Sequence, residues 1–168
     1  MAGTSTDDTS TDDRSCVVSV LLQRGAAHGP WGQPHWQVVG VVPESPGPAT
    51  QAPTRSLAHD GETTRTYLWR GLGLRLNPVS CDDYLLNLGG GRPLLFVICQ
   101  FDSAGELRPI TVSADQQDGV DALEVDGTVF EVDMPPSIAS WIAEWAPKYW
   151  KPSQRKGRKW QKLQEQWS

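Results

Sequence analysis

The stretch TRTYLWRGLGLRLN, residues 64–77, alternates apolar and polar side chains along most of its length. Such a period of two is typical of a β-strand with one buried face. The apolar face consists of Tyr67, Trp69, Leu72, Leu74 and Leu76. The stretch therefore predicts one long strand, with a bulge near Gly71, because glycine within a strand commonly marks a bulge.

Shorter strands are predicted on both sides of this one. They are CVVSVLLQR (16–24), WQVVGVVP (36–43), YLLNL (84–88), PLLFVICQF (93–101), LRPITVSA (107–114) and the pair within ALEVDGTVFEVDM (122–134). The GGGR segment between 88 and 93 predicts a hairpin loop, and Asp126-Gly127 predicts a type I′ turn. Residues 44–63 are rich in Pro, Gly, Ser and Thr, so we expect a mobile loop there.

The period changes near the end of the chain. Apolar residues at i, i+3, i+4, i+7 and i+8 predict a helix over 137–146, with Ser137 as N-cap and Pro147 ending it. Together these patterns predict a mainly β fold, an antiparallel sandwich or partly open barrel of about seven strands closed by one C-terminal helix. The layout resembles the pleckstrin-homology-like plan of seven strands and a C-terminal helix.

Charge divides the chain into three parts. Residues 1–15 are polar and acidic and predict a disordered tail, residues 16–150 form a single β-rich domain, and residues 151–168 form a basic tail that contains tryptophan. All five lysines lie at or after Lys148. No secretory signal and no apolar run long enough to span a bilayer is found, so we expect a cytoplasmic protein.

No residue pattern in the sequence predicts catalysis, a metal site or a bound cofactor. The three histidines lie in Pro/Gly-rich loops without zinc spacing. The three cysteines form no Cys-x-x-Cys pair, which indicates buried or idle thiols. The acidic cluster is Asp115, Asp118, Asp121, Glu124 and Asp126. It lacks the ligand alternation of a calcium loop, so a solvated turn or helix face is favoured over a calcium site.

The basic tail is where the sequence places a candidate binding site. Its residues are Trp150, Lys156, Lys159, Trp160, Lys162, Leu163 and Trp167. Trp160, Leu163 and Trp167 would share one face of a short helix, a pattern typical of docking to a partner protein or a membrane surface. Nucleic-acid binding is a rival hypothesis that the acidic body opposes, and a merely solvated tail is the third.

Three segments carry a resemblance to a known family: YLWRGLGLRLNP, DYLLNLGGGRPLLFVIC and LEVDGTVFEVDMPPSIASW. The chain resembles a proteobacterial family whose domain has unknown function, whose members are encoded beside formate dehydrogenase genes and sometimes carry the label molybdopterin-guanine dinucleotide biosynthesis protein A. The resemblance implies a non-enzymatic accessory or maturation protein that binds a partner, a subunit of a molybdenum-dependent formate dehydrogenase. It assigns no catalytic residue.

The alternative is an enzyme of molybdenum-cofactor biosynthesis that acts on a nucleotide. Such a nucleotidyltransferase requires a glycine-rich, basic loop after its first strand, within a parallel α/β sheet. Here GAAHGPWGQPHW follows the first strand, and the strand pattern is antiparallel. The sequence therefore favours the accessory protein.

Overall fold

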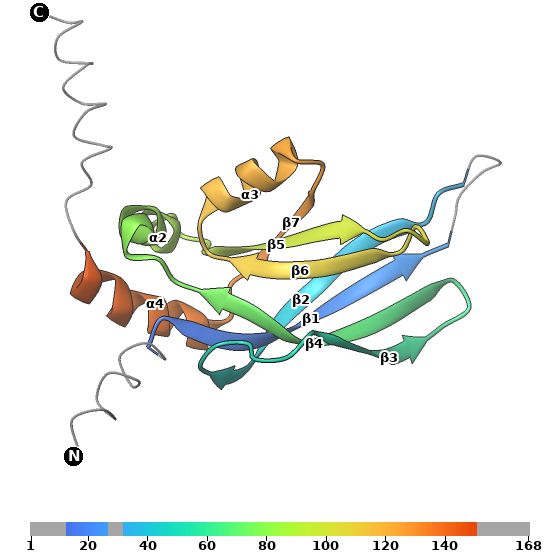
Figure 1. Cartoon of the computed structure of the whole chain (residues 1–168), viewed down its shortest axis with the longest axis horizontal. Coiled ribbons are helices and arrows are strands. Elements are labelled where there is room, and N and C mark those ends of the chain that lie inside the picture. The colour runs from blue at the N-terminus through green and yellow to red at the C-terminus, as the bar shows by residue number, and fades with distance from the viewer. Residues whose placement is uncertain (1–12, 27–31, 151–168) are drawn as a thin grey trace, which may run out of the picture.

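The computed structural model describes residues 13–26 and 32–150 (Figure 1). The elements are β1 (Ser15–Gly25), β2 (His35–Pro46), β3 (Thr54–Asp60), β4 (Thr64–Arg75), the 3-10 turn η2 (Pro78–Ser80), α2 (Cys81–Gly89), β5 (Leu94–Phe101), β6 (Leu107–Ser113), α3 (Gln116–Glu124), β7 (Thr128–Asp133) and α4 (Pro136–Tyr149). The fold is mainly β, as predicted.

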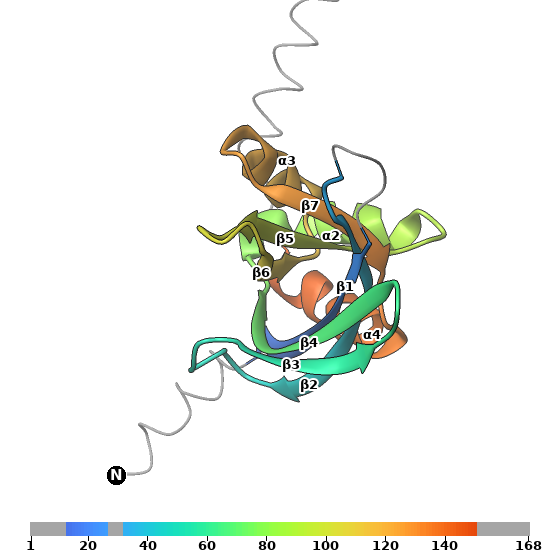
Figure 2. The same cartoon turned by 90° about the vertical axis from the view of Figure 1, so that its right-hand side faces the viewer.

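All seven strands of the described residues belong to one mixed sheet. Its order is β2-β1-β4-β6-β5-β7, and β3 pairs with β4 beside this path. The β4–β6 pairing is parallel and consists of the single pair Leu74 and Val112, whereas every other pairing between described strands is antiparallel. The sheet curls until β2 and β7 lie beside each other without a hydrogen-bonded ladder, which makes a partly open barrel (Figure 2).

The core fills the inside of this curled sheet. Val18, Val20 and Leu22 point inward from β1 at the expected period of two. On β4, the buried residues Trp69 and Leu72 pair with Val20 and Val18. Two residues between them, Arg70 and Gly71, therefore lie opposite the single residue Ser19 of β1. The predicted bulge is confirmed, and Gly71 within it has a φ of +85°, which glycine adopts without strain.

Helix α4 closes one end of the barrel. Ile138, Ile142 and Trp145 are buried against the sheet and α2. Figure 2 looks into the opposite, open end, with α4 behind the strands. The helix also holds the start of β1, because the Trp141 indole donates to the Asp13 carbonyl (3.1 Å) and the Tyr149 hydroxyl donates to the Asp13 carboxylate (2.9 Å).

The predicted bounds of this last helix were wrong at both ends. It begins after Pro135, and it continues through Pro147 to Tyr149 instead of ending there. A proline in the last turn removes only one backbone hydrogen bond. Stacking of Trp145 on Tyr149 (4.7 Å between centroids) compensates by fixing the final turn.

The predicted strand YLLNL and its glycine hairpin were also wrong, because this segment is helix α2. Asn77 caps the preceding turn by accepting from the Val79 N–H (3.2 Å), and acidic residues occupy the first helical turn. The GGGR segment joins this helix to β5. Asn87 fixes the end of α2 against the start of β5, because its side-chain amide donates to the Leu94 carbonyl (2.7 Å) and accepts from the Leu94 N–H (2.9 Å).

Two further predictions need correction. The loop at 44–63 contains the end of β2 and the whole of β3, and Asp60-Gly61 begins the turn between β3 and β4. The first arm of the predicted pair at 122–134 is the end of α3, so Asp126-Gly127 joins a helix to β7. Asp126 has a φ of 63°, and the Gly127 N–H donates to the Ala122 carbonyl (2.8 Å), which closes the helix end.

The packing of α4 predicts the effect of one core truncation. Ile142 is completely buried, so Ile142→Ala should lower the free energy of unfolding by about 2–5 kcal/mol through lost apolar contact and the cavity left behind. Urea denaturation followed by circular dichroism measures this change. Val39→Ala on the exposed face of β2 is the control and should change the stability little. Equal destabilisation by both variants would contradict the role given to α4.

Candidate functional site

Strands β3 and β6 both pair with the same edge of β4, each along a different part of it. Opposite β1, β4 pairs with β3 up to Arg70 and with β6 only at Leu74. If the parallel pairing of β4 with β6 continued towards the start of both strands, Arg108 of β6 would lie opposite Arg70 of β4. Instead, Thr54 of β3 is the residue paired with Arg70. The sheet therefore splits, and both β3 and the first half of β6 keep an unpaired backbone edge among the described strands.

A hollow of about 300 Å³ lies at this split, and we call it the Trp69 groove. It is lined by Pro53, Trp69, Gln100, Phe101, Asp102, Arg108, Pro109 and Ile110. Trp69 is 5% exposed, whereas Phe101 and Ile110 are at least half exposed. The groove thus combines a buried aromatic floor with apolar side chains at the surface.

Two guanidinium groups cover the aromatic floor. Arg55 of β3 lies 4.6 Å from the ring centroid of Tyr67 and 5.8 Å from that of Trp69, and Arg108 of β6 lies 5.4 Å from the Trp69 centroid. These are cation–π distances. Within residues 13–26 and 32–150 neither arginine forms an ion pair, and the buried Trp69 Nε1 has no hydrogen-bond partner. The aromatic floor thus lies beneath two arginines without an ion pair, and Asp102 is the one carboxylate residue in the groove lining.

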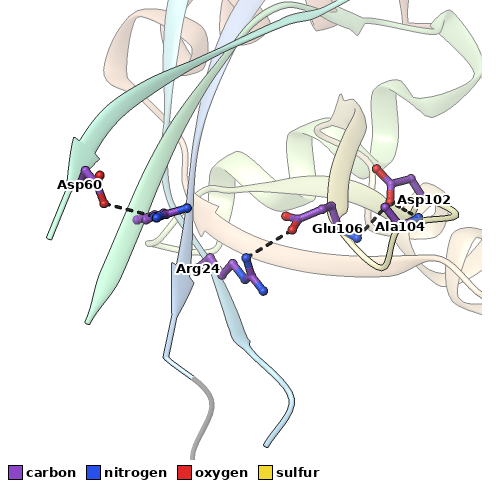
Figure 3. Close-up of polar contacts among 6 residues, drawn as sticks. Arg24, Asp60, Asp102, Ala104 and Glu106 are labelled. Carbon is purple, nitrogen blue, oxygen red and sulfur yellow. Dashed lines mark hydrogen bonds and ion pairs between the residues drawn. The ribbon is translucent and has the colours of Figure 1, made fainter. Parts of the chain in front are cut away.

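The β5–β6 hairpin that carries Arg108 is held by polar contacts (Figure 3). The Asp102 carboxylate accepts from the backbone N–H groups of Ala104 (2.9 Å) and Glu106 (3.0 Å), which stabilises the turn. Across the open end, Glu106 Oε1 lies 3.3 Å from Nη1 of Arg24 on β1. Because β1 belongs to the opposite wall, this ion pair fixes the hairpin relative to the barrel.

The family of the chain follows from a comparison with known families. The model of a protein of unknown function, DUF3305, matches residues 17–159. The chain belongs to the DUF3305 family. No curated protein and no solved structure matches it.

The binding residues predicted in the tail of this DUF3305 protein lie mostly outside the described residues. These are Lys156, Lys159, Trp160, Lys162, Leu163 and Trp167. Only Trp150 is described: it is 46% exposed directly after α4, and its indole donates to the Asp82 carboxylate at the start of α2. The structure therefore places Trp150, the residue before the tail, beside α2.

The acidic cluster of the DUF3305 chain is a helix N-terminus and an exposed helix face. Asp115 caps α3 by accepting from the Gln117 N–H (3.0 Å), and Asp118 accepts from the Ser113 hydroxyl (2.6 Å). Within the described part of the chain, no three His, Cys, Asp or Glu side chains gather in a way that could hold a metal ion. None of the helices described there is long and apolar enough to cross a membrane.

The groove residues were not predicted from the sequence. Trp69 was assigned to the core, which its burial confirms, and Arg55 fell within the predicted loop. Strand β3 is exposed along its whole length, so it has no alternation of buried and exposed positions to reveal it. The Asp60-Gly61 dipeptide precedes an alternating strand, and Asp-Gly is typical of a hairpin turn. This pattern indicates a further strand, β3, before the turn.

The thiols of the DUF3305 chain are free, and two of the three are buried. Burial raises the pKa of Cys16 to about 11 and that of Cys99 to about 12. Burial also raises the pKa of the Tyr84 hydroxyl to about 12. Because the thiolate is the reactive form, these cysteines stay unreactive at neutral pH.

These raised pKa values predict alkaline instability. The folded state holds the protons of Cys99 and Tyr84 up to about pH 12, whereas the unfolded chain loses them from about pH 9–10. The free energy of unfolding should therefore fall as pH rises from 9 towards 12. Urea denaturation at pH 8, 10 and 11 measures this slope. Tyr84→Phe should make the slope shallower, and an unchanged slope would contradict the assignment.

The ion pair at the open end predicts a measurable coupling. A double-mutant cycle of Arg24→Ala and Glu106→Ala should give a coupling of about 0.5–1 kcal/mol in unfolding free energy, because both side chains are only about one-third exposed. The control pair Arg92–Asp133 is closer, at 2.7 Å, but more than 70% exposed, so its coupling should be smaller. A larger coupling for the control would show that Glu106 does not brace the hairpin.

Proposed function

We propose that this DUF3305 protein is a non-enzymatic accessory protein of the cytoplasm that binds a partner protein. The observation that carries the proposal is the Trp69 groove, which opens between two unpaired strand edges. Extended peptides commonly bind by adding a strand to such an edge, and side-chain pockets beside the edge then provide specificity.

The residue types of the groove support a protein partner. Tryptophan and arginine are enriched among the residues that carry most of the binding energy of interfaces. Arg55 and Arg108 offer guanidinium groups that no described carboxylate occupies, and a partner carboxylate would bind them in a charge-assisted pair. Phe101 and Ile110 add exposed apolar surface at the rim.

A molybdenum-dependent formate dehydrogenase is the partner that we propose. The support for it is the family resemblance described above, in which members are encoded beside formate dehydrogenase genes. The accessory role in maturation of that enzyme rests on the same resemblance. The tail residues from Trp150 to Trp167 are proposed as additional partner contacts, because Trp160, Leu163 and Trp167 lie at helical spacing among lysines.

An enzyme of molybdenum-cofactor biosynthesis is the second candidate function. The residues of the Trp69 groove support it in one respect. An indole beside two unpaired guanidiniums could also hold the base and phosphates of a nucleotide. This alternative predicts saturable binding of GTP. Calorimetry that shows no heat with GTP, with and without magnesium, would reject it.

Removal of the groove arginines tests the proposed function. Full-length protein carrying Arg55→Gln and Arg108→Gln should recover a formate dehydrogenase subunit from its native host at least tenfold less well than the unmodified protein, which corresponds to about 1.4 kcal/mol. The matched control is Arg92→Gln, an exposed arginine on the loop before β5. Quantitative mass spectrometry of affinity-purified complexes measures the recovery.

Two results would contradict this proposal. Failure of the unmodified protein to enrich any molybdoenzyme subunit would remove the proposed partner. Equal recovery by the Arg55/Arg108 variant and the Arg92 control would show that the groove is not the binding surface. Circular dichroism of each variant establishes that the fold is intact before the comparison.

A further inference from the structure

A second exposed surface lies on helices α2 and α3. Twelve large hydrophobic side chains of the described residues are exposed, and half of them belong to these helices and their adjoining turns: Val79, Leu85, Leu86, Val120, Leu123 and Val125. We call this surface the α2–α3 face. The two helices are joined near their ends, because the Asn87 amide donates to the Ala114 carbonyl (3.0 Å) just before α3. Large exposed apolar side chains on neighbouring elements commonly mark an interaction site.

The α2–α3 face is acidic as well as apolar. The helix sequences CDDYLLNLG and QQDGVDALE contain five carboxylates and no lysine or arginine. Asp121 and Glu124 are exposed on α3, and Asp126, also exposed, lies two residues beyond Glu124. A segment that covers this face must therefore combine positive charge with large apolar side chains.

Residues 151–168 of the same chain have this composition. They contain four lysines and two arginines, with Glu165 as the single acidic residue. They also contain the apolar stripe Trp160, Leu163 and Trp167. Thus the charge and the apolar pattern of the tail are both complementary to the α2–α3 face.

The place where the described chain ends supports the same occupant. Trp150 donates a hydrogen bond to Asp82 at the start of α2, so the described chain ends beside one of the two helices of the face. Eighteen residues span about 27 Å as a helix and more when extended, whereas α3, with nine residues, is about 13 Å long. The tail is therefore long enough to cross both helices without leaving the molecule.

We propose that residues 151–168 dock in cis on the α2–α3 face, with Trp160, Leu163 and Trp167 against Leu86, Val120 and Leu123, and with the lysines beside the α3 carboxylates. This inference does not depend on the proposed function of the Trp69 groove. Its consequence is regulatory: a partner that binds the tail must first displace it from α2 and α3, so the tail and the face compete for the same contacts.

Zero-length cross-linking of the full chain tests this docking. A carbodiimide joins carboxylates to lysine amines only where they touch, so it should link Lys156, Lys159 or Lys162 to Asp118, Asp121 or Glu124. An equimolar mixture of ¹⁴N- and ¹⁵N-labelled protein separates links within one chain from links between chains. We expect same-isotope links at low salt that decrease severalfold at 0.5 M salt, where the Debye length is about 4–5 Å.

Full-length variants then test the apolar contacts. Leu86→Ser together with Leu123→Ser should reduce these links at least fivefold while leaving every carboxylate in place, and Val39→Ser on β2 is the control of similar exposure. Absence of tail-to-α3 links in the unmodified protein, or links unaffected by the double variant, would overturn the proposal. Links found only in mixed-isotope pairs would also overturn it and would make a second copy the occupant.

Discussion

The rest of the structure depends on the shared edge of β4. This strand is bound along its full length by β1 on one side, and on the other side β3 and β6 each take only a part of it. At each position along the edge of β4, the backbone can form hydrogen bonds with only one neighbouring strand. Strands β3 and β6 must therefore diverge where the part of β4 paired with β3 ends and the part paired with β6 begins. The Thr111 hydroxyl donates to the Gly73 carbonyl (3.0 Å) at the last point where β6 still reaches β4. Beyond it the sheet opens, and Trp69 becomes the floor of a groove.

Much of the sheet could be predicted from the sequence, because its strands bury one face. The period of two along β1 and β4, and the long apolar run of β5, follow directly from burial in the barrel. The bulge at Gly71 could be predicted because a glycine inside a strand pattern commonly marks a bulge. Strand β3 could not, because all seven of its residues are exposed and its neighbours are loop-forming residues.

The helices show the limit of local patterns more clearly. YLLNL has strand-like apolar content, but Asn77 and Pro78 start a helical turn before it, and Asn87 closes the helix against β5. These contacts involve residues on both sides of the apolar run and are invisible to a count of apolar positions. In α3 the polar residues outnumber the apolar ones, and its small inward residue Gly119 packs beside Val129 and Phe96. The candidate site could be predicted least, because it arises where strands diverge and where charges from separate elements meet.

The attachment of Asp13 to α4 joins the two ends of the described domain. Contacts from Trp141 and Tyr149 to this residue span more than 120 positions of sequence, so the first strand and the last helix stabilise each other directly. Chain ends that lie close together in space are the arrangement that tolerates circular permutation. A permuted chain that connects the C-terminal side of α4 to the N-terminal side of β1 by a short linker would keep these contacts covalently close, while new termini could be opened in the exposed turn between β3 and β4.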